Sequence, residues 1–91
     1  MNANAPGAAE VLRLDWSDAA LDDLHRVRAG LSGEAAARIG RIIVDAADCL
    51  IEFPEQGRMS GDGSRELPLP GLPWRLVYRT GGRGIIILRM I

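Results

Sequence analysis

Arginines in the last third of the chain are the residues best suited to chemistry. Arg75 and Arg79 share the stretch "WRLVYRT", Arg65 and Arg89 belong to the flanking stretches "RELPL" and "IIILRMI", and Arg58 stands further upstream. A guanidinium presents its donors in a planar fork that matches phosphate and carboxylate groups. The pattern is typical of a surface for an anionic partner, and equally of the solvent side of a sheet whose arginine stems cover apolar atoms. Spacing alone leaves both interpretations open.

Conventional catalytic and metal-binding patterns do not occur in the sequence. No Gly-rich loop leads into Lys-Ser or Lys-Thr, and "GGRG" lies between two strand candidates rather than before a helix. His25 and Cys49 occur singly, and we expect a solvated helix face for the first and a small core position for the second. The adjacent Asp22 and Asp23 point apart on a helix, so we expect them on a solvated face too. Neither a metal nor a cofactor is expected.

The composition is that of one small globular domain. The chain has 91 residues, of which 47% are hydrophobic and 25% charged, and its single cysteine fits a reducing cytoplasm. Residues 1–10 lack the basic and apolar regions of a signal peptide, so they are predicted to be a flexible leader before a single domain over residues 11–91. No apolar run is long enough for a membrane span.

Charge is distributed unevenly along the chain, although the net charge is only −1. Residues 1–57 hold five arginines against ten acidic residues, whereas residues 58–91 hold six arginines against two, and no lysine occurs anywhere. The net charge argues against a general nucleic-acid binder, while the basic C-terminal part suits an acidic partner.

Hydrophobic periodicity predicts two helices after a short strand over residues 11–16. Ser17 is a candidate N-cap for a helix over about residues 18–30, whose apolar stripe is formed by Leu21, Leu24, Val27 and Leu31. A second helix follows Ser32 and ends before Pro54, and its stripe comprises Ala36, Ile39, Ile43, Ala46, Ala47, Leu50 and Phe53. The short connection predicts an antiparallel helical hairpin.

Alternation replaces the helical period after a loop over residues 55–64. Residues 65–69, 74–80 and 85–91 are predicted as strands, with "GGRG" as a tight hairpin connection. The strand period places Arg75, Val77 and Arg79 outward and Trp74, Leu76 and Tyr78 toward the helices, and it sets Ile85, Ile87 and Arg89 opposite Ile86, Leu88 and Met90. The predicted fold is α+β, in the order β-α-α-β-β-β, with the helical hairpin packed on a small, largely antiparallel sheet.

Three motifs in order along the chain carry a family resemblance. They are A-x-x-D-L at Ala20–Leu24, L-x-x-x-P-x-x-G-R at Leu50–Arg58, and R-E-L at Arg65–Leu67 followed by P-W-R-L-V-Y-R at Pro73–Arg79. Over about Val11 to Ile91, the sequence resembles the ParE/RelE superfamily of toxins from type II toxin–antitoxin systems. The resemblance implies the same fold that the periodicity predicts.

The resemblance is closer to the ParE branch, whose members inhibit DNA gyrase by protein contact. RelE-like members instead cut messenger RNA on the ribosome with a basic and aromatic cluster, and only Arg75 matches a position of that cluster. The strand where lysines would stand has "ELPLPG", and the chain stops at Ile91, before the tail that completes the cluster. The resemblance therefore implies a non-enzymatic gyrase inhibitor. A ribosome-dependent endoribonuclease using Arg75, and an inactive antitoxin-binding homologue, are the alternatives.

Both branches imply a cognate antitoxin, whose acidic, extended or helical C-terminal segment would cover the toxin and form a hetero-oligomer with it. The function implied is that of a cytoplasmic toxin of the kind used in plasmid stabilisation. Direct nucleic-acid binding is not expected outside the antitoxin complex. The residues predicted to bind protein partners are Arg58, Arg65, Trp74, Arg75, Arg79 and Arg89.

Overall fold

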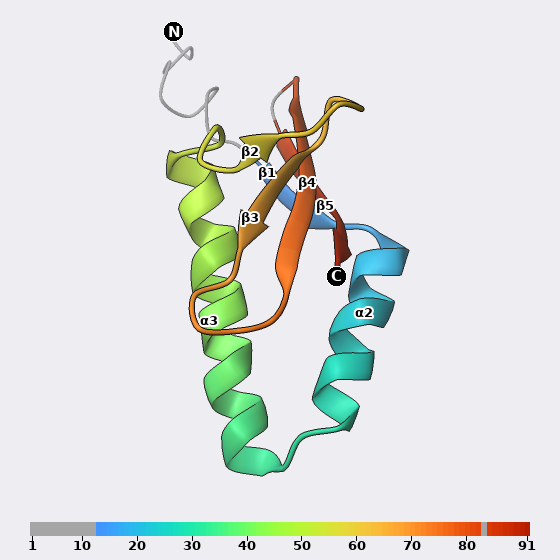
Figure 1. Ribbon diagram of the computed structural model, residues 1–91, viewed down its shortest axis with the longest axis vertical. Helices are drawn as coiled ribbons and strands as arrows, with labels where there is room; N and C mark the ends of the chain where they lie inside the picture. The colour runs from blue at the N-terminus through green and yellow to red at the C-terminus, as the bar shows by residue number, and fades with distance from the viewer. Residues whose placement is uncertain (1–12, 83) are drawn as a thin grey trace, which may run out of the picture.

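Two helices and five strands make up the computed structural model, which describes residues 13–82 and 84–91. The elements are β1 (Arg13–Trp16), α2 (Asp18–Ala29), α3 (Gly33–Glu52), β2 (Arg58–Met59), β3 (Arg65–Pro68), β4 (Arg75–Gly81) and β5 (Gly84–Met90) (Figure 1). The predicted α+β fold and its order are confirmed, with the two-residue β2 as an additional strand inside the predicted loop. The predicted leader and the first two residues of the predicted first strand lie outside the described residues.

The sheet has the strand order β1-β5-β4-β3-β2. β1 runs parallel to β5, and every other neighbouring pair is antiparallel. The predicted hairpin is present, because Gly81 pairs with Gly84 across a two-residue connection and Gly82 has a φ of 53°. The β4–β5 pairing extends to Ile91, whose backbone exchanges two hydrogen bonds with Arg75.

The helices run in opposite directions and are joined by a short turn at the end far from the sheet (Figure 1). Ser17 caps α2 as predicted, since its side chain accepts a hydrogen bond from the Ala20 N–H. Ser32 occupies the N-cap of α3, but its side chain makes no capping bond. Neither described helix is both long enough and apolar enough to cross a membrane.

The core lies between the helices and one face of the sheet. α3 buries the centre of its predicted stripe, and the sheet contributes the apolar side chains that face it; together these are Ile39, Ile43, Ala47, Leu50, Leu67, Leu76, Tyr78, Ile85, Ile87 and Met90. The predicted core positions of Leu21 and Phe53 are wrong. Leu21 is 38% exposed because Ala20 and Asp23 face the sheet instead, and Phe53 is 61% exposed because the helix has already ended there.

A β-bulge in β5 changes which of its residues reach the core. Val77 pairs with Arg89 and Tyr78 with Ile87, so Leu88 has no partner on β4. The predicted strict alternation, which grouped Arg89 with Ile87, is therefore wrong: Ile87 and Met90 are both buried, while Arg89 is exposed. The extra residue places Arg89 in the same cross-strand row as Val77, and the Arg89 side chain bends around the edge of β5 to reach α2.

Candidate functional site

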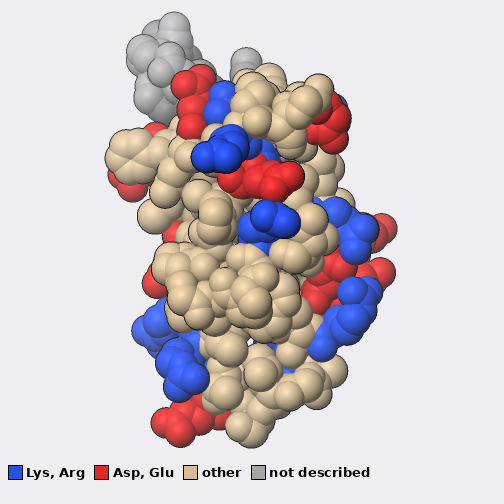
Figure 2. Space-filling view, in the orientation of Figure 1, with Lys and Arg blue, Asp and Glu red and all other residues tan. Residues whose placement is uncertain are grey.

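Cross-strand pairing gathers charged residues on the sheet face that points away from the helices. Arg58 pairs with Glu66, Glu66 with Val77, and Val77 with Arg89, so these four form one row across β2, β3, β4 and β5. Arg75 lies on the same face of β4, two residues before Val77. We call these five residues the arginine face. Basic and acidic side chains alternate over the upper half of the molecule in Figure 2.

At the β3–β4 part of the arginine face, Arg75 pairs with Glu66. The Arg75 Nε lies 3.3 Å from the Glu66 Oε1, and the two side chains are 53% and 38% exposed. A hollow of about 500 Å³ lies beside this pair, and Arg58 and Gln56 also line it. Because exposed ion pairs of this kind contribute little free energy, a carboxylate from a partner can replace Glu66 at Arg75 at small cost.

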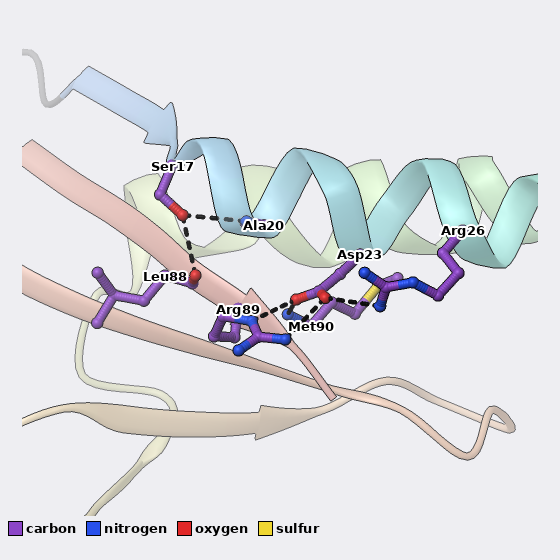
Figure 3. Close-up of polar contacts among 7 residues, drawn as sticks. All are labelled: Ser17, Ala20, Asp23, Arg26, Leu88, Arg89 and Met90. Carbon is purple, nitrogen blue, oxygen red and sulfur yellow. Dashed lines mark hydrogen bonds and ion pairs between the residues drawn. The ribbon is translucent and has the colours of Figure 1, made fainter.

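The β5 part of the arginine face is built differently, around the buried carboxylate of Asp23 on α2 (Figure 3). Its two oxygens accept hydrogen bonds from Arg89, over 2.7 Å from Nε and 2.9 Å from Nη2, and from the Met90 N–H over 2.9 Å. Arg26 adds a bond of 3.2 Å. These donors, Arg89 first, hold the pKa of the Asp23 carboxyl far below its usual range despite burial. The expectation of a solvated Asp23 is therefore wrong.

The reason for this arrangement is the shortness of β1. β1 pairs with β5 only as far as Ile87, so the rest of that β5 edge has no strand beside it. The Ser17 hydroxyl donates a 2.9 Å hydrogen bond to the Leu88 carbonyl, and Asp23 accepts from Met90 (Figure 3). α2 therefore satisfies the edge of β5 that a longer β1 would have covered.

Tyr78 lies on the opposite, helix-facing side of β4, as predicted, and is fully buried. Its hydroxyl donates to the Pro54 carbonyl over 2.9 Å and accepts from the Gly57 N–H over 2.8 Å. A Cβ at position 57 would lie 2.7 Å from that hydroxyl oxygen, so only glycine fits there. The proline and glycine of the L-x-x-x-P-x-x-G-R motif thus hold Tyr78, and both hydrogen-bonding roles of its hydroxyl are structural.

The six residues predicted to bind partners do not all lie at one place in the structure. Arg58, Arg75 and Arg89 lie together on the arginine face. Arg65 instead donates to the Glu55 and Gly57 carbonyls over 3.3 and 2.9 Å. Arg79 lies on the outward face of β4 with Arg75 and Val77, as predicted, and donates to the Asp62 carbonyl over 3.2 Å. Trp74 is half-buried and packs against the core.

These contacts connect Arg65 to the segment between α3 and β2, and Arg79 to the loop between β2 and β3. Within that loop Asp62 accepts hydrogen bonds from the Ser64 hydroxyl and N–H over 2.6 and 3.0 Å, which lower the pKa of the Asp62 carboxyl. The loop is therefore anchored by its own hydrogen bonds and by Arg79.

An apolar groove beside α3 has no counterpart in the sequence-based predictions. It measures about 340 Å³, and α3 faces the β3–β4 connection across it; its lining comprises Ile42, Asp45, Ala46, Cys49, Gln56, Leu67, Pro68 and Pro70. The predicted core position of Cys49 is wrong, because this side chain is exposed at the groove. Ile42 and Cys49 lie beside the predicted stripe, two helical turns apart, and together with Ala46 of the stripe they are the signal that could have indicated the groove. The described residues contain no group of His, Cys, Asp and Glu that could hold a metal ion.

Comparison with known proteins agrees with this architecture. The family model described as "ParE toxin of type II toxin-antitoxin system, parDE" matches residues 14–91. The chain belongs to the ParE toxin family. Among solved structures, the chromosomal ParDE toxin–antitoxin system from P. aeruginosa is similar, with a TM-score of 0.77 and 27% sequence identity over 89% of this chain and 95% of that one. A search of curated proteins found no match.

Membership of the ParE family has two consequences for the site. The closer resemblance to ParE than to RelE is confirmed, and a toxin of a ParDE system implies an antitoxin partner.

Proposed function

We propose that this ParE toxin inhibits DNA gyrase by protein contact through its arginine face, and that a cognate antitoxin neutralises it in the cytoplasm. Family membership supports the proposal, together with the geometry of the arginine face. Arg75 and Arg89 lie beside the half-buried Val77, Arg58 lies one strand further away beyond Glu66, and Arg75 and Arg89 each form an ion pair with a carboxylate. Arginines around an apolar centre are typical of protein interfaces.

The main observation against RNA cleavage is that the Tyr78 hydroxyl is buried and fully hydrogen-bonded. Cutting RNA at a 2′-hydroxyl requires a base that activates this hydroxyl and a cation that stabilises the phosphate. Arg75 supplies only a cation, and the hydroxyl of the nearby Tyr78 is buried and hydrogen-bonded on the other side of β4. The sequence has no lysine to take the role of the base. The arginine face therefore favours protein contact over catalysis.

The test uses purified toxin, freed from its antitoxin and checked for folding by circular dichroism. We expect it to block supercoiling by DNA gyrase or to accumulate cleaved DNA, while messenger RNA in a translation extract stays intact. Addition of the antitoxin, the product of the neighbouring reading frame, should restore supercoiling. Folded toxin that leaves gyrase unaffected while codon-phased cuts appear in messenger RNA would contradict the proposal and favour the RelE-like alternative.

A further inference from the structure

One side of α3 carries exposed residues at the spacing of a coiled-coil seam. α3 forms one long side of the molecule (Figure 1). Beside its buried face, on the flank away from the apolar groove, residues follow one another at intervals of four, three, four and three positions, as a and d residues do in paired helices. We call them the α3 strip, and all of them are exposed: Ala37, Arg41, Val44, Asp48 and Ile51. None of them lines the apolar groove.

The order of residues in the α3 strip makes it complementary to itself. Val44, which is 52% exposed, stands at the centre, with Arg41 and Ala37 before it and Asp48 and Ile51 after it. A second copy of the helix running antiparallel across Val44 places Arg41 of each copy beside Asp48 of the other. A parallel copy would instead bring arginine to arginine and aspartate to aspartate. Charge complementarity therefore favours an antiparallel contact with two-fold symmetry.

Arg41 and Asp48 are free to make these contacts. Neither forms an ion pair among the residues that the structure describes. Seven positions along α3 separate the two by about 10 Å, so they do not meet within one helix. Charged residues in such a seam mainly fix the direction and register of the helices. The apolar contact would come from Val44 and from the partly exposed Ile51.

Gly40 provides an independent observation at the same place. It lies inside α3, where glycine is less favourable than alanine. A Cβ at this position would meet no other described part of the chain within 4 Å, so packing within one molecule does not require glycine. Gly40 is next to Ala37 on the helix surface, and the two leave space for a large side chain from a second helix. In the antiparallel arrangement that side chain is Ile51 of the second copy.

We propose that the protein forms a two-fold dimer in which the α3 strips of two copies pack antiparallel across Val44. The proposal rests on the charge order and on Gly40, and it needs neither the gyrase target nor the antitoxin. A contact over one helix face belongs to the small interfaces, below about 1,200 Å², that form weakly and reversibly. A Kd of about 10–100 μM is therefore expected. The α3 strip shares no residue with the arginine face, so each dimer carries two arginine faces.

Sedimentation equilibrium of the full chain, purified free of antitoxin, tests the dimer between about 5 and about 500 μM. The wild type should pass from monomer to dimer over this range. Val44→Glu should weaken self-association at least about tenfold. The matched control Arg38→Asp changes an exposed residue of α3 outside the strip and should stay within about twofold. A wild type that remains monomeric throughout, or a dimer that Val44→Glu leaves unchanged, would contradict the proposal.

A charge exchange tests the antiparallel register. Arg41→Asp and Asp48→Arg should each weaken self-association about tenfold, because each variant brings like charges together at both ends of the contact. An equimolar mixture of the two variants should recover wild-type association, since every charged pair is then opposite again. Circular dichroism confirms that each variant is folded. A mixture that associates no better than its components would overturn the register.

Gly40→Ala separates the dimer from a purely structural role of this position. Alanine favours the helix, so the melting temperature should rise by a few degrees. Self-association should weaken about threefold or more, because the added methyl group takes up the space of Ile51 from the second copy. Stabilisation of the chain with unchanged or tighter association would contradict the packing at Gly40.

Discussion

Arg89 and Arg75 both belong to the arginine face, but their ion pairs with carboxylates differ in burial, in hydrogen bonding and in the elements that they connect. Asp23 is buried and receives two hydrogen bonds from Arg89 and one from the backbone of Met90, whereas Glu66 is partly exposed and meets Arg75 through a single contact of 3.3 Å. The first pair joins α2 to the edge of β5. The second connects β3 and β4, which backbone pairing already holds together. One arginine therefore maintains the fold, and the other is available to a partner.

Among variants that test this difference, the largest loss of stability is expected at Asp23. Asp23→Ala leaves the Met90 N–H buried without an acceptor and removes the partner of Arg89, which should cost about 3 kcal/mol in the free energy of unfolding. Urea denaturation followed by circular dichroism measures it. The neighbouring Asp22→Ala, on an exposed residue, should change stability by less than about 0.5 kcal/mol. Equal effects of the two variants would contradict the structural role of Asp23.

A second, somewhat smaller loss is expected where Tyr78 meets Gly57. Gly57→Ala places a methyl group 2.7 Å from the Tyr78 hydroxyl oxygen and 3.0 Å from the Glu66 carbonyl oxygen, so we expect a loss of about 2 kcal/mol. Tyr78→Phe leaves the Gly57 N–H without its acceptor and should cost about 1–2 kcal/mol.

Thermal melts measure the stability of both variants. The toxicity of the folded Tyr78→Phe protein then tests whether the hydroxyl group has a role beyond stability. We expect this variant to arrest growth in proportion to the amount of folded toxin, because the hydroxyl group is structural. Complete loss of toxicity in a fully folded Tyr78→Phe toxin would instead indicate a chemical role for Tyr78.

The decrease in the free energy of unfolding at acidic pH should also depend on Asp23. The pKa of this carboxyl is depressed in the folded chain, so below the unfolded value of about 3.9 the unfolded chain binds a proton that the folded chain does not. Stability is then present above that pH and falls as the pH decreases, by up to about 1.4 kcal/mol per pH unit. Urea midpoints of wild type and Asp23→Asn between about pH 4 and pH 3 compare the slopes. Parallel slopes would show that the depressed pKa does not contribute.

The smallest effect on stability is expected at the exposed Arg75–Glu66 pair. Glu66→Gln should change the free energy of unfolding by less than about 1 kcal/mol, because both side chains are solvated. The same variant frees Arg75, so the affinity of the toxin for an antitoxin with an acidic segment should rise by a few-fold, measured by titration calorimetry. Weaker antitoxin binding without Glu66 would mean that this carboxylate itself contacts the partner.

The difference between the two pairs explains which features could be predicted from the sequence. The outward direction of Arg75 and the buried direction of Tyr78 follow from strict alternation in β4, and the capping role of Ser17 follows from its position before an apolar stripe. Asp22 and Asp23 look alike in the sequence, however. Which of them is buried depends on where β1 ends beside β5, and this is a tertiary fact.

The bulge at Leu88 could not be predicted from the sequence for a related reason. Apolar residues occupy both faces of β5 from Ile85 to Leu88, so the pattern contains no polar residue that would reveal a shift of one position. The exposure of Cys49 likewise depends on how far the β3–β4 connection lies from α3. Periodicity predicts which side chains share a face, but it does not predict which neighbouring segment covers that face.

The most direct test of the account is supercoiling by DNA gyrase in the presence of Arg75→Glu toxin. Because Arg75 is exposed and its ion pair is weak, the variant should keep the melting temperature of the wild type within a few degrees. It should nevertheless require at least about tenfold more protein for the same inhibition, since the arginine face is the proposed contact surface. Wild-type inhibition by a folded Arg75→Glu toxin would contradict that claim.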